Sequence, residues 1–381
     1  MTKQAIYLDY AAATPIDKRV LKAMEPYFSN NFYNPSANYL AAKEVKKEIE
    51  LARGQVASII GSKPNEIVFT AGGTEANNLS LAGVMKNYPK ANLVISTIEH
   101  PSIYEPATNF NTKLCKVDKY GLIDLDKLSK TIDDSTVLVS IMYVNNEIGA
   151  IEPLSNISRL IKQIREDRQN KGIKLPIYLH TDACQAANYL DLHTSRLGVD
   201  LMTLNGGKIY GPKQSGALFV KSSVKLSPLI YGGGQERALR SGTENVASII
   251  GFSHALELAQ TNHKTNAAKI TDLQKYFIQE LTTIPGTNIN GSLTKRIANN
   301  IHVTFKGIDN EWLLIKLDDL GIMAASGSAC SAAKLKPSTV LSAIGLTDQD
   351  ARSSIRLSLG STTTKQDIDL VIKALRSLID N

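Results

Sequence analysis

A lysine flanked by glycines near the centre of the chain has the surroundings that most favour covalent chemistry. Lys208 ends the run Asn205-Gly206-Gly207-Lys208, which lies between the apolar stretches 201–204 and 217–220. This pattern predicts two strands joined by a glycine-rich turn. Poor hydration beside buried strands favours the neutral amine, which forms Schiff bases with aldehydes. The alternative is a solvated hairpin lysine without a chemical role.

Two other segments favour the chemical alternative. Asp182 follows the strand-like stretch 177–180, and Gly73-Thr74 lies between the strand-like stretch 67–70 and a helical stretch. A buried carboxylate needs a cationic partner, and amides at the start of a helix bind phosphate. An amine, a carboxylate and a phosphate cradle are what pyridoxal 5'-phosphate (PLP) requires. The three segments together therefore predict a PLP site.

The elements that must position these residues alternate between strand and helix. This alternation predicts an α/β fold with a mostly parallel sheet covered by helices on both faces. Ligands of such sheets bind beyond the carboxyl ends of the strands. The polar residues that follow predicted strands are expected to meet at that edge, and they are Thr74, His100, Asn146, Asp182 and Lys208.

The chain is expected to form two domains. A helix from about residue 245 leads out of the sheet, and a separate helix near 266–283 opens a smaller α/β arrangement with strands at 300–305 and 355–359. We expect a large PLP-binding domain of residues 16–258. Residues 1–15 and 259–381 would form the small domain.

Two helices are predicted at the start of the chain. Thr14-Pro15 is typical of a helix N-terminus, and Val20, Leu21, Met24 and Phe28 are expected on its buried face. A longer helix with an apolar stripe from Ala41 to Ile59 is expected to end at Gly61.

One of the three cysteines lies among very small side chains. Cys330 belongs to Ala-Ala-Ser-Gly-Ser-Ala-Cys-Ser-Ala-Ala, which predicts a mobile loop over 325–336 and an accessible, reactive thiol. Cys115 and Cys184 are interpreted instead as small buried apolar residues.

Four further residues have side chains suited to a flat cofactor or an amino-acid substrate. The ring of His100 can stack on a cofactor and exchange protons, and Gln185 can hydrogen-bond a ring hydroxyl. Arg356 alternates with Ile355 and Leu357 on a strand, where it is either an exposed edge residue or a planar fork for a carboxylate, assisted by Asn146. Asn34 is expected either to line the cleft or to form only a turn.

Composition limits the remaining classes of function. The 381 residues carry 43 Lys and Arg against 36 Asp and Glu, a net charge of +7 without any basic block. No direct nucleic-acid partner is therefore expected. Three irregularly spaced cysteines exclude a disulfide framework and a zinc site, so no metal is expected. Without a signal peptide or a long apolar window, we expect a cytoplasmic protein with no membrane partner.

Seven motifs together resemble those of one enzyme family. In order they are Tyr-Leu-Asp-Tyr-Ala-Ala-Ala-Thr-Pro, Glu-Ile-Val-Phe-Thr-Ala-Gly-Gly-Thr-Glu, Val-Asn-Asn-Glu-Ile-Gly, Lys-Ile-Tyr-Gly-Pro-Lys, Gly-Gly-Gly-Gln-Glu-Arg, Arg-Ser-Gly-Thr and Ser-Gly-Ser-Ala-Cys-Ser. Across residues 7 to 360 they resemble the cysteine desulfurases of the NifS and IscS group, which have PLP fold type I and belong to the class-V aminotransferases. The cysteine motif differs from that of the SufS-like branch.

The resemblance implies a homodimer that converts L-cysteine to L-alanine and a persulfide on Cys330. The sulfur would pass to an acceptor protein, either an iron-sulfur scaffold or a tRNA-thiolation enzyme. The alternatives are a selenocysteine lyase or aminotransferase on the same scaffold, and a non-catalytic partner protein. A transaminase needs no thiol such as Cys330.

The resemblance also implies a role for each site residue. Lys208 would bind the cofactor aldehyde, Asp182 the ring nitrogen and Gln185 the ring hydroxyl, while His100 would stack on the ring and transfer protons. Gly73 and Thr74 would hold the phosphate, with Thr243 of the other subunit. Asn146 and Arg356 would hold the substrate.

The chain departs from the resemblance at the phosphate. Relatives usually have Ser-x-His-Lys where this chain has Asn205-Gly206-Gly207-Lys208. Asn205 can still donate a hydrogen bond, whereas Gly207 offers only its amide. Losing two contacts would weaken cofactor binding by about 1 to 3 kcal/mol each if the phosphate stays desolvated, so we expect looser cofactor retention than in relatives.

Overall fold

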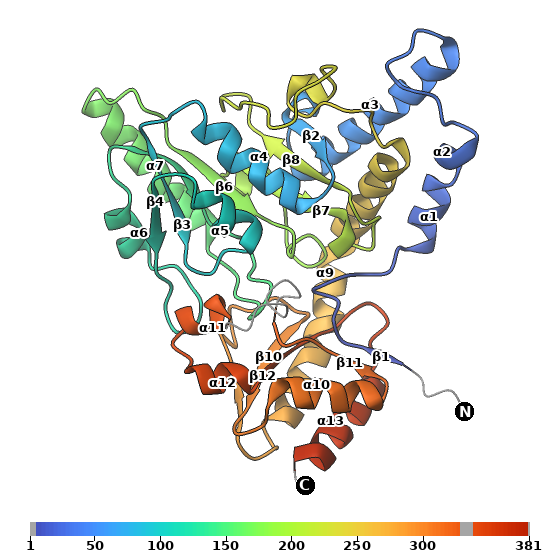
Figure 1. Cartoon of the computed structure of the whole chain (residues 1–381), viewed down its shortest axis with the longest axis vertical. Helices are drawn as coiled ribbons and strands as arrows, with labels where there is room; N and C mark the ends of the chain where they lie inside the picture. The colour runs from blue at the N-terminus through green and yellow to red at the C-terminus, as the bar shows by residue number, and fades with distance from the viewer. Residues whose placement is uncertain (1–4, 328–337, 380–381) are drawn as a thin grey trace.

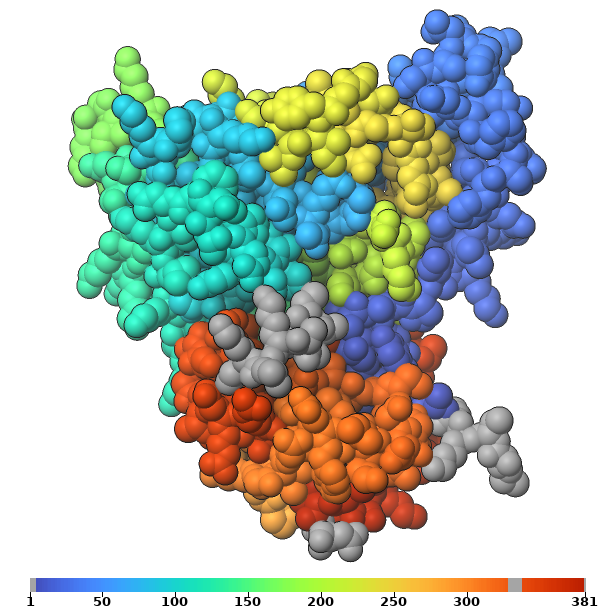
Figure 2. All heavy atoms as spheres, viewed as in Figure 1, coloured from blue at the N-terminus to red at the C-terminus, as the bar shows by residue number. Residues whose placement is uncertain are grey.

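The protein folds into two lobes joined by one long helix (Figure 1). The computed structural model describes residues 5–327 and 338–379. A large lobe is built on a seven-stranded sheet, and a small lobe is built on a three-stranded sheet. Figure 2 shows the small lobe packed directly against the wider large lobe.

The sheet of the large lobe has the order β2-β8-β7-β6-β5-β3-β4. Its strands are β2 (Ile67–Thr70), β3 (Asn92–Ser96), β4 (Thr112–Cys115), β5 (Thr136–Ser140), β6 (Tyr178–Asp182), β7 (Leu201–Asn205) and β8 (Gly216–Val220). Strands β4, β3, β5, β6 and β7 are parallel, and β8 is antiparallel to both β7 and β2. The predicted mostly parallel sheet is confirmed.

Helices cover both faces of this sheet and bury strands such as β2, β3 and β5 completely, whereas the edge strand β4 stays partly exposed. They are α3 (Leu40–Ile60), α4 (Gly73–Met85), α5 (Pro101–Ala107), α6 (Leu125–Thr131), α7 (Leu154–Asn170) and α8 (Thr194–Leu197), with 3-10 turns η1 (Pro64–Glu66), η2 (Gly206–Lys208) and η3 (Glu236–Ala238). Two apolar clusters result. One contains Leu79 of α4 and Leu93 of β3, and the other contains Val56 of α3 and Ile161 of α7.

One continuous helix, α9 (Val246–Leu281), runs from the large lobe into the small one. The expectation of two separate helices, the second near 266–283, is wrong. The polar stretch at 261–266 interrupts the apolar pattern, but this part of α9 is largely exposed and needs no apolar face. The expected domain boundary at 258/259 falls inside α9, and the two domain ranges stay a prediction.

The small lobe packs helices against an antiparallel sheet of order β12-β10-β9. Its elements are β9 (Thr287–Ile289), β10 (Asn300–Phe305), α10 (Asn310–Asp319), β11 (Ile322–Met323), α11 (Thr339–Ala343), α12 (Asp348–Arg352), β12 (Ser354–Ser358) and α13 (Lys365–Ile379). The first strand, β1 (Ile6–Tyr7), pairs with β11. Within the described ranges, no helix is long and apolar enough to cross a membrane.

The N-terminal helix starts later than the sequence suggests. α1 (Lys18–Met24) is capped by Asp17, and α2 (Pro26–Ser29) follows it. The hydroxyl of Thr14 instead contacts the loop that carries the lysine, donating to Gly207 O at 3.1 Å. Val20 and Met24 are buried as expected, but the expected burial of Leu21 and Phe28 is wrong, because both side chains are exposed. α1, α2 and the start of α3 stand out at the corner of the large lobe (Figures 1 and 2).

Candidate active site

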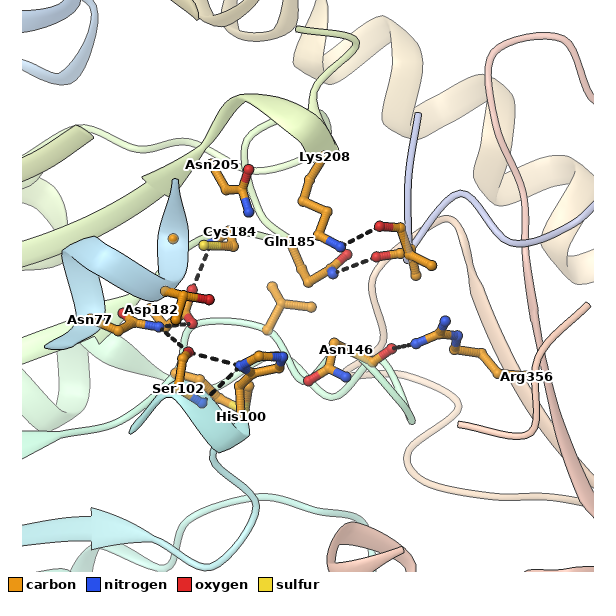
Figure 3. Close-up of a pocket in the computed structure, with 16 residues that line it drawn as sticks. Asn77, His100, Ser102, Asn146, Asp182, Cys184, Gln185, Asn205, Lys208 and Arg356 are labelled. Atoms are coloured by element: carbon orange, nitrogen blue, oxygen red, sulfur yellow. Dashed lines mark hydrogen bonds between the residues drawn. The ribbon is translucent and has the colours of Figure 1, made fainter. Parts of the chain in front are cut away.

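The carboxyl ends of the strands open into a cavity of about 280 Å³ between the two lobes (Figure 3). Most of the residues singled out from the sequence line it: Gly73, Thr74, His100, Asn146, Asp182, Gln185, Asn205, Lys208 and Arg356. The expectation that the five strand-end residues meet at one edge is therefore confirmed. Ala11, Ala12, Asn77, Ser102, Met142, Val144 and Cys184 complete the lining.

Lys208 reaches into the cavity from the turn between β7 and β8 (Figure 3). Its Nζ donates to Ala12 O at 2.5 Å, and its backbone oxygen accepts from Asn188 Nδ2 at 2.9 Å. Burial, with a contribution from the nearby charge of Arg356, lowers the pKa of the ammonium. The turn thus holds the amine in surroundings that favour its neutral form.

Asp182 ends β6 with its carboxylate buried beside the cavity, and the residue is 5% exposed. Oδ2 accepts from Asn77 Nδ2 at 2.7 Å, and Oδ1 accepts from the backbone N–H of Cys184 at 2.9 Å. Both donors are neutral and leave the negative charge uncompensated. A cation in the cavity would balance this charge.

His100 lies on the same hydrogen-bonded chain. Asn77 Nδ2 also donates to Ser102 Oγ at 2.8 Å, and Ser102 Oγ lies 2.8 Å from His100 Nδ1. The backbone N–H of Ser102 donates to the same Nδ1, which makes this nitrogen an acceptor and places the proton of the neutral ring on Nε2. Burial lowers the pKa of His100, so the ring is neutral at neutral pH.

One end of the cavity, here called the phosphate concavity, lies at Gly73 and Thr74, where α4 begins after β2. Gly72, the N-cap of α4, has φ 120°, a conformation that L side chains rarely adopt. A Cβ on Gly73 would lie 2.7 Å from Cys184 Sγ, so a larger residue would collide there. Gly73 and Thr74, the first two residues of α4, line the cavity, and the N–H groups at a helix start suit an anion.

Asn205 and Gly207 interact with each other at this end. Asn205 Oδ1 accepts from the backbone N–H of Gly207 at 3.0 Å. Asn205 Nδ2 faces Gly73, 3.3 Å from where a Cβ on that glycine would stand. Gly207 is buried behind the cavity and its amide is already paired, while Asn205 keeps an amide group directed at the phosphate concavity.

Arg356 occupies the opposite end of the cavity and is 2% exposed. One terminal nitrogen donates to Asp9 Oδ1 at 2.7 Å, and the other donates to the backbone oxygen of Asn146 at 2.8 Å. Its buried Nε has no partner in the described part of the chain. A carboxylate would satisfy such a donor.

The cysteines have different surroundings. Cys115 is buried on β4, as expected, and burial raises its pKa to about 11. The interpretation of Cys184 as a small buried residue is correct only in part. The residue is half-buried, and it lies just beyond the end of β6, where it lines the cavity. Burial and the nearby Asp182 raise its pKa, which keeps the thiol neutral. Cys330 lies outside the described residues.

Two of the predicted residues, Thr243 and Asn34, lie away from the cavity. They share a second hollow beside α2. Gln185 does line the cavity, and its Nε2 donates to Ala11 O at 2.9 Å.

Sequence reasoning missed Asn77, Ser102 and Asp9. Asn77 lies one helical turn after Thr74, and Ser102 lies two residues after His100. Their short distance in sequence from these two predicted site residues could have identified them.

The residues present fit PLP. A poorly hydrated lysine, a buried carboxylate that accepts from neutral donors, a concavity at a helix start and a neutral ring line one cavity. These are the groups that the aldehyde, ring nitrogen, phosphate and flat face of PLP require.

Comparisons with known proteins agree with this fit. A family model described as aminotransferase class-V matches residues 6–371. Cysteine desulfurase IscS of Dictyoglomus turgidum is 40% identical over 386 residues, covering 99% of this chain and 95% of that protein. The solved structure of a NifS-like protein has a TM-score of 0.91 at 30% identity, covering 99% of this chain and 100% of that one. A structure of SspA in complex with cysteine has a TM-score of 0.80 at 34% identity, covering 93% and 98%.

The fold and the site define a PLP-dependent enzyme of fold type I. The chain belongs to the class-V aminotransferase family and, within it, to the cysteine desulfurases of the NifS and IscS group.

Proposed function

We propose that this cysteine desulfurase converts L-cysteine to L-alanine, with Cys330 receiving the sulfur as a persulfide. The main support is that Lys208, Asp182 and Arg356 line one cavity, and that the buried Nε of Arg356 has no hydrogen-bond partner among the described residues. The substrate amine would meet Lys208, and its carboxylate would meet Arg356, assisted by Asn146. A solved relative of 34% identity is described as a complex with cysteine, which supports the same substrate here.

PLP bound in this cavity would withdraw electrons from the substrate Cα. Asp182 would hold a proton on the ring nitrogen, Gln185 would bind the ring hydroxyl, and Gly73, Thr74 and Asn205 would bind the phosphate, with Gly207 fixing the orientation of Asn205. Lys208, once neutral and displaced by the substrate amine, would take the Cα proton. His100 would stack on the ring and exchange protons through Nε2.

Cys330 would act as the nucleophile. As a thiolate it would attack the substrate sulfur, forming a sulfur–sulfur bond as the bond between substrate sulfur and Cβ breaks. Protonation of Cβ then gives alanine. Neither Cys115 nor Cys184 suits this role, because burial raises the pKa of both thiols and keeps them neutral.

The sulfur would pass to an acceptor protein of iron-sulfur cluster assembly or tRNA thiolation in the cytoplasm. A homodimer is part of this proposal. Thr243 is exposed and lies outside the cavity, so it would act on the phosphate of the other subunit, and Asn34 would line the substrate cleft from there. Exposed aromatic side chains near Asn34, including Phe28 and Phe32, support a covering partner.

Steady-state formation of alanine and sulfide tests the proposal. The PLP-loaded protein is incubated with L-cysteine and a reductant, alongside Cys330→Ala and the control Cys115→Ala. We expect both products from the native chain and from Cys115→Ala, and neither from Cys330→Ala. A keto acid in place of sulfide would indicate an aminotransferase. If the protein with bound PLP forms no product, L-cysteine is not its substrate.

A further inference from the structure

Glu147 follows Asn146 in a loop that joins the two lobes. The loop is held in shape by Asn145, whose Oδ1 accepts from the N–H groups of Glu147 and Ile148, both at 2.9 Å. Asn145 Nδ2 donates to Ile98 O at 3.0 Å, which ties the loop to the segment leading to His100. The direction of the Glu147 side chain is therefore set by the same turn that places Asn146 in the cavity.

The small lobe holds this loop at several points. Asn300 Nδ2 donates to Glu147 O at 2.9 Å, and the N–H of Ile297 donates to Gly149 O at 2.9 Å. Ile151 also donates its N–H to Lys295 O at 3.0 Å. These hydrogen bonds fix the loop between the two lobes, directly beside the substrate end of the cavity.

The Glu147 side chain forms a further contact between the loop and the small lobe, at Ser338. The residue is 5% exposed, and its Oε2 accepts from Ser338 Oγ at 2.5 Å. Ser338 Oγ also accepts from the N–H of Leu341, so the same hydroxyl caps α11. Burial raises the pKa of Glu147, while the Ser338 hydrogen bond and the charge of Arg356 lower it.

Chain connectivity gives this contact its importance. Ser338 follows Cys330 by only a short stretch of sequence. On the other side of Cys330, Ala325 forms a β-bridge with Arg356, whose N–H donates to Ala325 O at 2.6 Å. The backbone on both sides of Cys330 is therefore attached to residues at the substrate end of the cavity.

We propose that Glu147 is a positioning residue for sulfur transfer, because it fixes Ser338, and with it α11, against the Asn146 loop beside the substrate. The inference rests on the proposed role of Cys330. Glu147 would not contact substrate or cofactor; it would set where the chain that carries the nucleophile is attached.

Single-turnover alanine formation without reductant is the measurement, together with bound PLP and the absorbance change on adding L-cysteine. Loss of one such hydrogen bond predicts roughly a tenfold slower turnover in Glu147→Ala, with PLP content and L-cysteine affinity retained. Glu147→Gln should stay within about twofold of the native rate, since its carbonyl oxygen still accepts from Ser338. The double variant Glu147→Ala/Ser338→Ala should be no slower than the slower of the two single variants.

A second pair keeps the test decisive if Glu147→Ala does not fold. Ser338→Ala loses the hydroxyl and should be slowed, whereas Ser338→Thr keeps it and should approach the native rate. Additive losses, or an effect confined to L-cysteine affinity, would overturn the inference. If the native chain makes no alanine, the proposed function itself fails; if it is active and Glu147→Ala matches it, only this inference fails.

Discussion

Burial sets the protonation state of the side chains around the cavity. Lys208 has a lowered pKa and His100 is neutral, while the thiol of Cys184 is kept protonated. In each case desolvation is the largest cause, and the charged neighbours only modify it. The site therefore presents an amine whose neutral form is favoured by burial, a neutral ring and one buried carboxylate, and this charge pattern suits a cationic ring.

Asn205 carries a prediction at this scale. Asn205→Ala removes the Nδ2 directed at the phosphate concavity and frees the N–H of Gly207. We expect the dissociation constant of PLP to rise by roughly tenfold, the equivalent of one hydrogen bond to a charged group. Dialysis followed by the absorbance of retained cofactor measures it. Asn205→Ser, which keeps a donor, is the control, and equal retention in the native chain and Asn205→Ala would contradict the assignment.

The sequence alone was sufficient to identify the site residues that directly follow buried strands. Asp182 and Lys208 were identifiable because a buried strand before each one leaves few positions for a polar group. The contact of Cys184 with the cavity was missed. The strand end that places Asp182 at the cavity also places Cys184 there, two residues later. Asp9 was missed because its contact with Arg356 joins residues 347 positions apart, and no local pattern signals such a pair.

At the scale of elements, start and stop signals were informative only where no tertiary partner competed. α3 ends at Gly61 as predicted, because Gly61 has φ 66° and accommodates the left-handed turn. Thr14 has the pattern of an N-cap, yet it binds Gly207 and Tyr210 in the lysine loop, and Asp17 caps the helix instead. Long-range contacts thus overrode the local signal.

Gly54 within α3 and Gly61, which caps the C-terminus of α3, give opposite predictions. Gly61→Ala places a Cβ in a left-handed conformation and only 2.2 Å from His193 Nε2, and we expect a loss of about 1 to 3 kcal/mol. Gly54→Ala, mid-helix with no atom within 4 Å, should gain roughly 0.5 to 1 kcal/mol. Calorimetry should show a lower unfolding midpoint for the first and a higher one for the second. A lower midpoint for both would mean that α3 cannot accept a side chain at Gly54.

At the scale of the whole molecule, two buried carboxyl groups make stability depend on pH. Burial raises the pKa of Glu99 and of Glu152 to about 8, from an ordinary 4.5. Between these values the folded chain keeps protons that the unfolded chain has released. The free energy of unfolding should therefore decrease as pH rises from about 5 to about 8.

Glu152 isolates this effect because it does not line the cavity. Its two carboxylate oxygens accept from the backbone N–H of Ile123, at 3.0 and 3.2 Å. Glu152→Gln cannot ionise and keeps an acceptor for that N–H. Urea unfolding at about pH 6 and about pH 8 should show a smaller decrease for the variant than for the native chain. Identical decreases would mean that Glu152 is already ionised in the folded chain.

The proposed homodimer gives a prediction for the exposed aromatic corner formed by α1, α2 and the following loop. Phe32 is 66% exposed and stacks on Tyr33 at 4.7 Å between ring centroids. Phe32→Asp should shift the protein towards monomer in analytical ultracentrifugation, because a charge would be buried in the interface. Leu293→Asp in the small lobe, at 65% exposure, is the matched control and should stay dimeric. If the native protein is a fully active monomer, the proposed homodimer is wrong.

Mapping sulfur on the chain tests the central claim most directly. The PLP-loaded protein is mixed with one equivalent of L-cysteine without reductant, quenched, and analysed by peptide mass spectrometry. We predict that one added sulfur atom appears on the peptide containing Cys330, together with one equivalent of alanine, and that the peptides containing Cys115 and Cys184 stay unmodified. Alanine without sulfur on Cys330, or sulfur on Cys184 instead, would contradict the account.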